Sequence, residues 1–359
     1  MELFLDTNAH MPMSEPAINA FIATNNSLAG HGHALSPSVP GRSAESAIEK
    51  AREEIAEVIG AETPNQIFFT STCTQACEWG IDIFRNINKG FIYCSPTEHP
   101  AVLQALNKNN KNLLNLNIDQ NTRIDSSMEF PENSGVVCML VQNEVGLIQP
   151  IFDLKAKSIF CDMSQAPGKV KLPKLFDIKN LDVAVFGAHK FGGPVSVGFV
   201  YIRDVNYWFK KDTGSRYFLD RAGTPDTCSI VACSAALKYA VNTLDERRVK
   251  CLAFRNYVEN EMENLGFKII AKDVERVPGT TFAAVPEGKY SQVLMYELGQ
   301  RGIYIGLGSA CGSTYTGVSP LIRIISQNDT AQNYIRISQY GEYGLQEAKY
   351  FIDILKDIL

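Results

Sequence analysis

Six short apolar runs, separated by stretches with helical character, constrain the fold of this 359-residue chain more than any other feature. Runs of this length that are bounded by polar or turn residues are typical of buried strands. Strands that alternate with helices predict an α/β domain with a mostly parallel sheet. The runs are QIFFT (66–70), GFIYC (90–94), GVVCMLV (135–141), SIFCD (158–162), DVAVFG (182–187) and VGFVYI (197–202).

The clearest helical segment is SAESAIEKAREEIAEVI, residues 43–59, which is followed by Gly60. Its apolar residues recur at helical spacing, and a glycine is a common helix stop. Serine is a favoured N-cap residue, so we expect the helix to begin near Ser43.

The pattern changes after about residue 245. Helical stretches at about 246–265, 290–300 and 345–358 surround short β-like runs at 267–272, 280–285 and 303–308. This arrangement of helical and β-like segments predicts a smaller α+β domain. We therefore expect a large domain over residues 15–245 and a small domain formed by residues 1–14 and 246–359.

Composition excludes several classes of protein. The net charge of -5 argues against a nucleic-acid-binding protein, which would present a basic face. No apolar stretch approaches the length of a membrane span, and the opening residues do not resemble a signal peptide. The nine cysteines lack metal-site spacing, and several lie in apolar runs, which favours buried thiols, no metal site and a cytoplasmic location.

Polar residues follow the predicted strands at the points where each strand ends. The segments are STCTQAC, SPTEHPAV, QNEVG, DMSQ and HKFGGP, which supply Thr74, His99, Asn143, Asp162 and Lys190. Because ligand sites in parallel α/β sheets form at the carboxyl ends of strands, we expect these side chains to lie together.

This set suits pyridoxal phosphate. A lysine amine can join the cofactor aldehyde, and an aspartate can keep the ring nitrogen protonated. A helix start with hydroxyl residues can bind a phosphate. Each residue also has a plain structural interpretation: Asp162 as a helix cap, His99 as a turn residue and Lys190 as the first solvated residue after a strand.

Seven motifs, in order along the chain, resemble the NifS/IscS-type cysteine desulfurases, which are class V pyridoxal-phosphate enzymes of fold type I. Such a resemblance implies a large, mostly parallel-sheet domain and a smaller α+β domain. The motifs are TEHPAV (97–102), QNEVGLIQP (142–150), CDMSQAPGK (161–169), GAHKFGGP (187–194), RAGT (221–224), GSAC (308–311) and IRIS (335–338).

The resemblance implies that L-cysteine is converted to L-alanine and that its sulfur passes to Cys311 as a persulfide. Lys190 would carry the cofactor and move the substrate proton, and His99 would stack on the cofactor ring. Asn143 and Arg336 would bind the substrate, and Arg336 would do so by contacting the substrate carboxylate. The other implied cofactor contacts are Cys73, Thr74, Asp162, Gln165, Gly187, His189 and Thr224.

The resemblance also implies a homodimer, since Thr224 would reach the phosphate of the partner subunit, and a sulfur-acceptor protein, for example in iron–sulfur cluster assembly. Gly187 stands where the family has a serine, and Ser38 where it has a histidine. Two alternatives stay open. The chain could be another class V enzyme (an aminotransferase, or a selenocysteine or cysteine sulfinate lyase) or a non-catalytic partner subunit of that fold.

Overall fold

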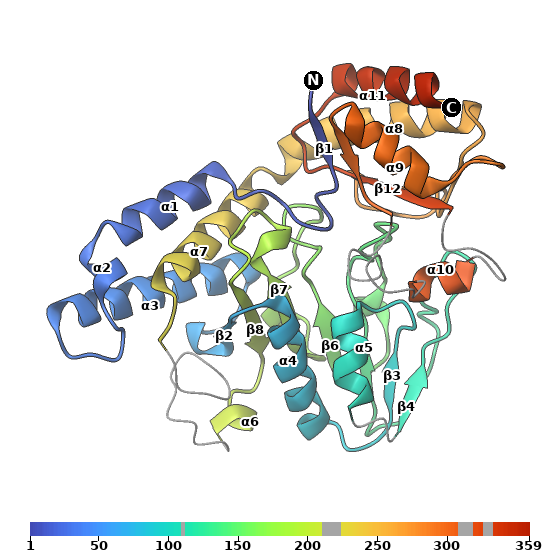
Figure 1. The fold of residues 1–359 in the computed structure, drawn as a ribbon. Helices are drawn as coiled ribbons and strands as arrows, with labels where there is room; N and C mark the ends of the chain where they lie inside the picture. Colours follow the sequence, from blue (N-terminus) through green and yellow to red (C-terminus); the bar gives the residue numbers. More distant parts are fainter. Residues whose placement is uncertain (109–111, 210–223, 308–318, 326–332) are drawn as a thin grey trace.

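The computed structural model describes residues 1–108, 112–209, 224–307, 319–325 and 333–359 (Figure 1). A sheet with the strand order β2-β8-β7-β6-β5-β3-β4 forms its centre. β8 runs antiparallel to both of its neighbours, whereas the other pairs are parallel, so the predicted mostly parallel sheet is confirmed. The strands are β2 (Ile67–Thr70), β3 (Ile92–Cys94), β4 (Leu113–Asn115), β5 (Gly135–Val137), β6 (Ile159–Asp162), β7 (Leu181–Gly187) and β8 (Gly198–Ile202).

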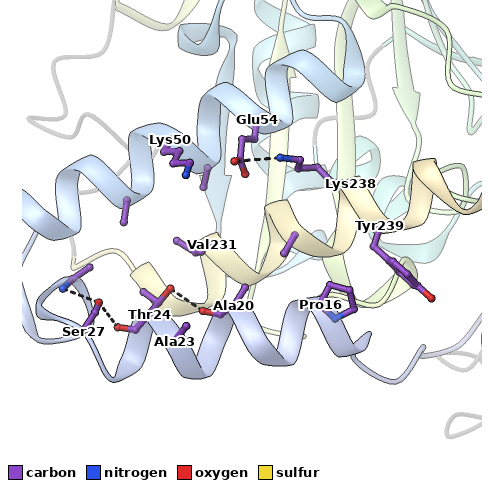
Figure 2. Close-up of a pocket in the computed structure, with 14 residues that line it drawn as sticks. Pro16, Ala20, Ala23, Thr24, Ser27, Lys50, Glu54, Val231, Lys238 and Tyr239 are labelled. Carbon is purple, nitrogen blue, oxygen red and sulfur yellow. Dashed lines mark hydrogen bonds and ion pairs between the residues drawn. The ribbon is translucent and has the colours of Figure 1, made fainter.

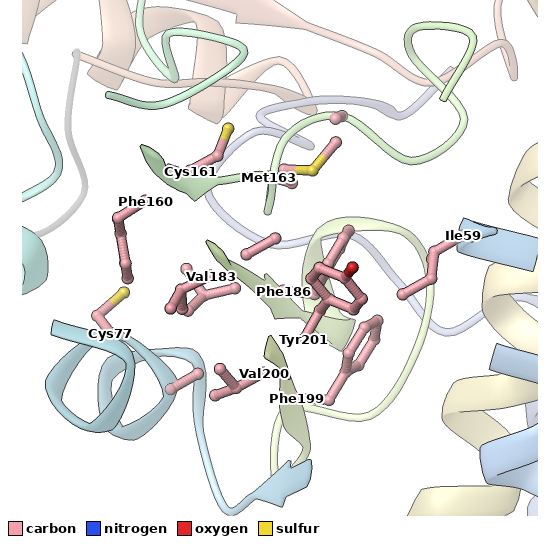
Figure 3. Packing of buried hydrophobic residues seen from close by; sticks show 14 of the residues in the cluster. Ile59, Cys77, Phe160, Cys161, Met163, Val183, Phe186, Phe199, Val200 and Tyr201 are labelled. Carbon is pink, nitrogen blue, oxygen red and sulfur yellow. The ribbon is translucent and has the colours of Figure 1, made fainter. Parts of the chain in front are cut away.

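The middle of this sheet is buried on both faces. In β7 every residue except Asp182 is buried, as its nearly continuous apolar sequence predicts. The rings of Phe186 and Phe199 stack across β7 and β8 with their centroids 4.5 Å apart, and Figure 3 shows Val183 and Val200 close by. This rigid, dry layer fixes the positions of the strand ends.

Helices cover the sheet. α4 packs on β7 and β8, while α1 and α3 pack against α7 (Figure 1). The helices of this part are α1 (Glu15–Asn25), α2 (Leu28–His31), α3 (Val39–Ile59), α4 (Cys73–Ile87), α5 (Pro100–Asn107), α6 (Asn206–Phe209) and α7 (Thr227–Asn242). No helix within the described ranges combines the length and the apolar character needed to span a membrane.

The prediction that α3 begins near Ser43 is wrong. The helix begins at Val39, and the Ser38 hydroxyl caps it by accepting a hydrogen bond from the Gly41 amide at 3.2 Å. Pro40 made the segment before Ser43 look non-helical. Proline is nevertheless tolerated in the first turn of a helix, because its missing N–H would have no intrahelical partner there. The predicted end is correct, since Gly60 adopts a left-handed conformation with φ 65°.

A second group of strands joins the two ends of the chain. β10 (Thr280–Ala284) pairs antiparallel with β12 (Tyr334–Ser338) and with β9 (Lys268–Ile269), and β1 (Leu3–Leu5) pairs in parallel with β11 (Ile303–Ile305). Figure 1 shows β1 beside the C-terminal helices. The helices of this part are α8 (Leu244–Asn264), α9 (Ser291–Gln300), α10 (Pro320–Ile325) and α11 (Leu345–Ile358), of which α10 lies apart from β1.

The buried apolar residues fall into separate clusters. The largest surrounds the central sheet, whereas Leu3 and Leu5 pack with Phe254 and Phe351 in a second cluster. This separation supports the division into a large domain (15–245) and a small domain (1–14 and 246–359), which stays a prediction.

The run at 267–272 forms only a two-residue strand, because Ala271 has a φ of 53° and leaves the β region.

Candidate active site

A cavity of about 180 Å³ lies at the carboxyl ends of the central strands. Segments far apart in the sequence meet in its walls, including the residues just after β1 and the strand β12. Most of the residues predicted for the site line this cavity. The lining residues are Asn8, Ala9, Cys73, Thr74, His99, Ala101, Met139, Val141, Asn143, Asp162, Ser164, Gln165, His189, Lys190 and Arg336.

Three predicted residues are not in this lining. Gly187 is the last residue of β7 and lies directly behind Cys73. Thr224 is exposed to solvent. Cys311 falls within residues 308–318, outside the described part of the chain.

Lys190 lies in a single 3₁₀ turn (Ala188–Lys190) that follows β7. Its Nζ donates hydrogen bonds to the backbone carbonyls of Asn8 at 2.9 Å and Ala9 at 2.6 Å. The amine is therefore held in the cavity rather than released to bulk solvent, which argues against the interpretation of Lys190 as a merely solvated strand end.

Asp162 and His99 stand at the ends of two other strand segments. Asp162 closes β6, is 8% exposed and accepts a hydrogen bond from the Ser164 amide at 2.9 Å through Oδ1. His99 is the N-cap of α5, and its Nδ1 accepts from the Ala101 amide at 3.2 Å. Since an accepting Nδ1 carries no proton, the His99 ring is held in one tautomer.

Burial lowers the pKa of His99, and the positive charge of Lys190 acts in the same direction against the opposing charge of Asp162. The ring is therefore neutral near pH 7. A neutral imidazole on the cavity wall can pack against a flat ligand and can exchange a proton through its other nitrogen.

The start of α4 forms one end of the cavity. Thr72 caps the helix by accepting from the Gln75 amide at 3.1 Å. The first amides of a helix have no intrahelical acceptor, so those of Cys73 and Thr74 are available to an acceptor from outside the helix. A helix start of this kind attracts anions.

His189 lies at the same end of the cavity. Its Nδ1 is buried and has no hydrogen-bond partner within the described ranges. Burial, followed by the positive charge of Lys190, lowers the pKa of His189 to about 3. An anion bound here would be attracted by the charge of Lys190 and could use the unsatisfied nitrogen of His189.

Lowering the pH is expected to destabilise the cofactor-free protein through His189. Since its pKa of about 3 lies below the ordinary 6.5, the unfolded chain binds a proton between these values that the folded protein excludes. The free energy of unfolding therefore falls as the pH drops through this window, and His99 contributes in the same direction. Urea unfolding of a His189→Asn variant should show a smaller loss between about pH 7 and pH 5.

The matched control is His33→Asn, because His33 is exposed to solvent. This variant should lose stability with acidification as much as the parent protein does. An equal loss in the His189→Asn variant would contradict the assignment of the pH dependence to His189.

Asn8 connects the walls of the cavity, a role that the sequence did not reveal. Its carbonyl accepts from Lys190 and, at 2.8 Å, from the Gln165 amide nitrogen. Its side chain donates to Thr280 Oγ1 at 3.0 Å and accepts from Lys169 Nζ at 2.7 Å. Asn8 thus ties the strand ends of the central sheet to β10.

Lys169 is a second residue whose role sequence reasoning missed, although it belongs to the motif CDMSQAPGK. Its Nζ is buried between Asn8 and Gln165 and donates to both side chains. Burial lowers the pKa of Lys169 well below its ordinary value, and the nearby charges of Lys190 and Arg336 lower it further. By donating to both side chains, Lys169 fixes the orientation of Gln165 beside Asn8.

Arg336 extends from β12 and is 1% exposed. Its Nε and Nη2 donate to Asp6 Oδ1 at 3.3 and 2.7 Å, and its Nη1 donates to the Asn143 carbonyl at 3.1 Å. A guanidinium has five N–H groups, so these bonds leave two for another acceptor. Asp6 therefore orients Arg336 while leaving it able to bind one further carboxylate.

A larger cavity of about 660 Å³ lies between α1, α3 and α7 (Figure 2). Alanine and other small side chains form most of its wall, and Lys238 and Glu54 form an ion pair at 3.3 Å on one side. It contains none of the strand-end residues, so it carries none of the predicted chemistry.

Known proteins resemble this chain over nearly its whole length. Cysteine desulfurase of Mus musculus is 29% identical, with 96% of this chain and 78% of the relative covered. Cysteine desulfurase IscS of Clostridium botulinum (strain Kyoto / Type A2) is also 29% identical, with 87% of this chain and 83% of the relative covered.

Solved structures share the fold. A NifS-like protein superposes with a TM-score of 0.86 at 26% identity, covering 100% of this chain and 99% of the other. The structure of SspA in complex with cysteine superposes with a TM-score of 0.75 at 21% identity, covering 96% and 100%, and supports the fold alone. The predicted fold type I is confirmed.

The family model for class-V aminotransferases matches residues 3–347, which is most of the chain. The matched region contains the strand ends that form the cavity and the strand β12 that supplies Arg336. The expectation drawn from the seven motifs is thereby confirmed, and the chain belongs to the class-V aminotransferase family.

Proposed function

We propose that this protein is a pyridoxal-phosphate-dependent cysteine desulfurase, which converts L-cysteine to L-alanine and retains the sulfur as a persulfide on Cys311. The observation that carries the proposal is the convergence of Lys190, Asp162, His99 and Arg336 on one cavity. The names of the relatives above support the choice of L-cysteine as substrate.

The residues of the cavity fit the cofactor. The Lys190 amine on its wall suits an aldehyde, and the start of α4, together with the unsatisfied His189 Nδ1, suits a phosphate. Lys190 would hold the cofactor covalently, Asp162 would pair with its ring nitrogen, and His99 would pack on the ring. Gln165 and Asn143 would bind the ring side of the cofactor, with Cys73, Thr74, Gly187 and His189 at its phosphate.

When bound, pyridoxal phosphate supplies an electron sink that stabilises negative charge at the substrate Cα. Arg336 binds the substrate carboxylate with its two remaining N–H groups, and Asn143 lies beside it. The Lys190 amine then takes the Cα proton and returns it, for which its location in the cavity is suited.

Sulfur transfer depends on Cys311. Its thiolate attacks the sulfur of the bound cysteine, so an S–S bond forms while the substrate C–S bond breaks. The electron pair of the broken bond remains with the three-carbon fragment, which takes up protons to become alanine. One L-cysteine and one thiol give one L-alanine and one persulfide. The thiolate, rather than the thiol, is the reactive form.

The experiment that tests this proposal is the mass of the peptide containing Cys311 after the purified protein has reacted with L-cysteine. A gain of one sulfur atom on that peptide, together with release of alanine, is the expected result. The Cys311→Ala variant should bind pyridoxal phosphate normally but release neither alanine nor sulfide, since the attacking thiolate is gone.

Other outcomes would overturn the proposal. Formation of a keto acid instead of alanine would indicate an aminotransferase, and activity only on selenocysteine or cysteine sulfinate would indicate the corresponding lyase. A protein that binds no cofactor would be a non-catalytic subunit. Cys228→Ala is a matched control, because Cys228 lies in α7 and should leave the reaction unchanged.

We further propose a cytoplasmic homodimer in which Thr224 reaches the cofactor phosphate of the partner subunit. Thr224 is exposed in the single chain, as a residue that contacts a partner must be. The persulfide would pass to a sulfur-acceptor protein, for which iron–sulfur cluster assembly is the pathway suggested by the family resemblance.

A further inference from the structure

Cys73 and Gly187 compete for the same space at the end of the cavity. Cys73 is the first residue of α4, and Gly187 is the last residue of β7. A Cβ atom built on Gly187 would lie 2.8 Å from Cys73 Cβ and 3.0 Å from Cys73 Sγ. Carbon atoms do not approach this closely without displacement, so the two positions together have room for one side chain.

Backbone conformation does not explain the glycine. Gly187 has φ −112° and ψ 115°, which any residue adopts readily in a strand. The absence of a side chain at this position is therefore explained by packing. Gly187 leaves the space that the Cys73 side chain fills.

Polar groups hold the Cys73 thiol at the cavity wall. Its Sγ lies 3.0 Å from the hydroxyl oxygen of Ser164, and Ser164 also lines the cavity. On the inner side, a hydrogen bond with Cys73, followed by burial, raises the pKa of Cys77 well above its ordinary value. Cys77 lies deep in the core beside Phe160 (Figure 3). The thiol therefore has a fixed neighbour on each side.

We propose that the Cys73 thiol and the Ser164 hydroxyl supply the side-chain donors for the cofactor phosphate at this end of the cavity, in the space that a side chain at position 187 would otherwise occupy. The inference rests on the proposed function, since the ligand is the phosphate of pyridoxal phosphate. Both side chains line the cavity beside Thr74 and the unsatisfied His189 nitrogen. A thiol is a weaker donor than a hydroxyl, so Ser164 makes the stronger contact.

The first test is a double-mutant cycle read by the Kd of pyridoxal phosphate for the cofactor-free protein, measured by absorbance titration. Gly187→Ser alone should raise Kd more than 10-fold, because the added side chain collides with Cys73. Cys73→Gly alone should raise Kd about 3- to 10-fold through loss of one weak donor. The combined variant should return Kd to within about 3-fold of the parent, because removal of both Cβ and Sγ at position 73 leaves room for the new side chain.

The result of this test depends on whether the effects of the two substitutions on Kd are additive. Effects of Gly187→Ser and Cys73→Gly on Kd that simply add would overturn the inference, since two side chains that need the same space must compensate each other. Cys233→Ala is the matched control: it removes another buried thiol, but in α7 and away from the cavity, and should leave Kd unchanged.

A second test needs no variant and so does not depend on folding of the Gly187→Ser protein. Cys73 is partly exposed in the single chain, and iodoacetamide should alkylate it in the cofactor-free protein. Pyridoxal phosphate should slow this alkylation at least 10-fold as measured by peptide mass. Pyridoxal without phosphate should protect less, and inorganic phosphate should protect in part.

The two tests separate failure of this inference from failure of the proposed function. Pyridoxal phosphate that binds, as judged by its absorbance, while Cys73 reacts at an unchanged rate would overturn the inference alone. A parent protein that shows no binding of pyridoxal phosphate at all would overturn the proposed function and the inference with it.

Discussion

Replacing Lys190 by alanine is expected to lower the rate of alanine formation from L-cysteine by about 10²- to 10⁴-fold. The variant loses the amine that Asn8 and Ala9 hold in the cavity, and with it the group proposed to carry the cofactor and to move the substrate proton. The measurement is alanine produced per mole of protein, with cofactor supplied in excess. The absorbance of the bound cofactor should change as well, since the covalent link is lost.

The matched control is Lys179→Ala, which removes an exposed lysine and should leave the rate unchanged. Thermal unfolding of both variants shows whether the fold is intact. A Lys190→Ala protein that folds and keeps most of the parent rate would contradict the role assigned to this amine.

Replacing Glu259 by alanine is expected to destabilise the protein by about 3–5 kcal/mol, because it leaves the buried guanidinium of Arg276 without its counter-charge. The Glu259 side chain is 5% exposed and the Arg276 side chain 2% exposed. They form a bidentate ion pair with N–O distances of 2.8 and 2.9 Å. Glu259 also accepts a hydrogen bond from Thr281 at 2.9 Å. Urea unfolding measures the loss, which is a large share of the stability of most proteins.

Glu263 offers a control on the same helix. It forms an ion pair with Lys272 in which both side chains are 39% exposed, so Glu263→Ala should cost about 1 kcal/mol or less. Equal costs for Glu259→Ala and Glu263→Ala would show that burial of the Arg276 pair has no energetic consequence. The buried pair lies next to Thr280, which bonds Asn8, so its loss should also weaken cofactor binding.

The parts of the fold and the site that could be predicted from the sequence are those encoded locally. Apolar runs specified β2, β6, β7 and β8 to within one or two residues. Asp162 is the last residue of one such run, and Lys190 lies in the short turn that follows another. Because parallel strands bring their carboxyl ends to one edge, sequence order alone was enough to bring these residues together.

The contacts of the chain ends could not be predicted, because they arise from packing between segments remote in sequence. Nothing within the stretch LDTNAH indicates that Asp6 will orient Arg336, which is 330 positions away. The same is true of the hydrogen bond from Asn8 to Thr280 in β10. The sequence likewise does not show that the Cys73 side chain occupies the space that a side chain at position 187 would need, because this contact arises only when α4 packs against β7.

The joining of the two chain ends has a consequence for biosynthesis. The Asn8 amide donates to the hydroxyl of Ser338, and Arg336 holds Asp6, so the N-terminal segment gains these anchors only after residues up to 338 have left the ribosome. Contacts of such long sequence separation form late and slow folding. We therefore expect the central sheet to form first in the nascent protein, and a closed site able to retain a cofactor to form only when β12 has been synthesised.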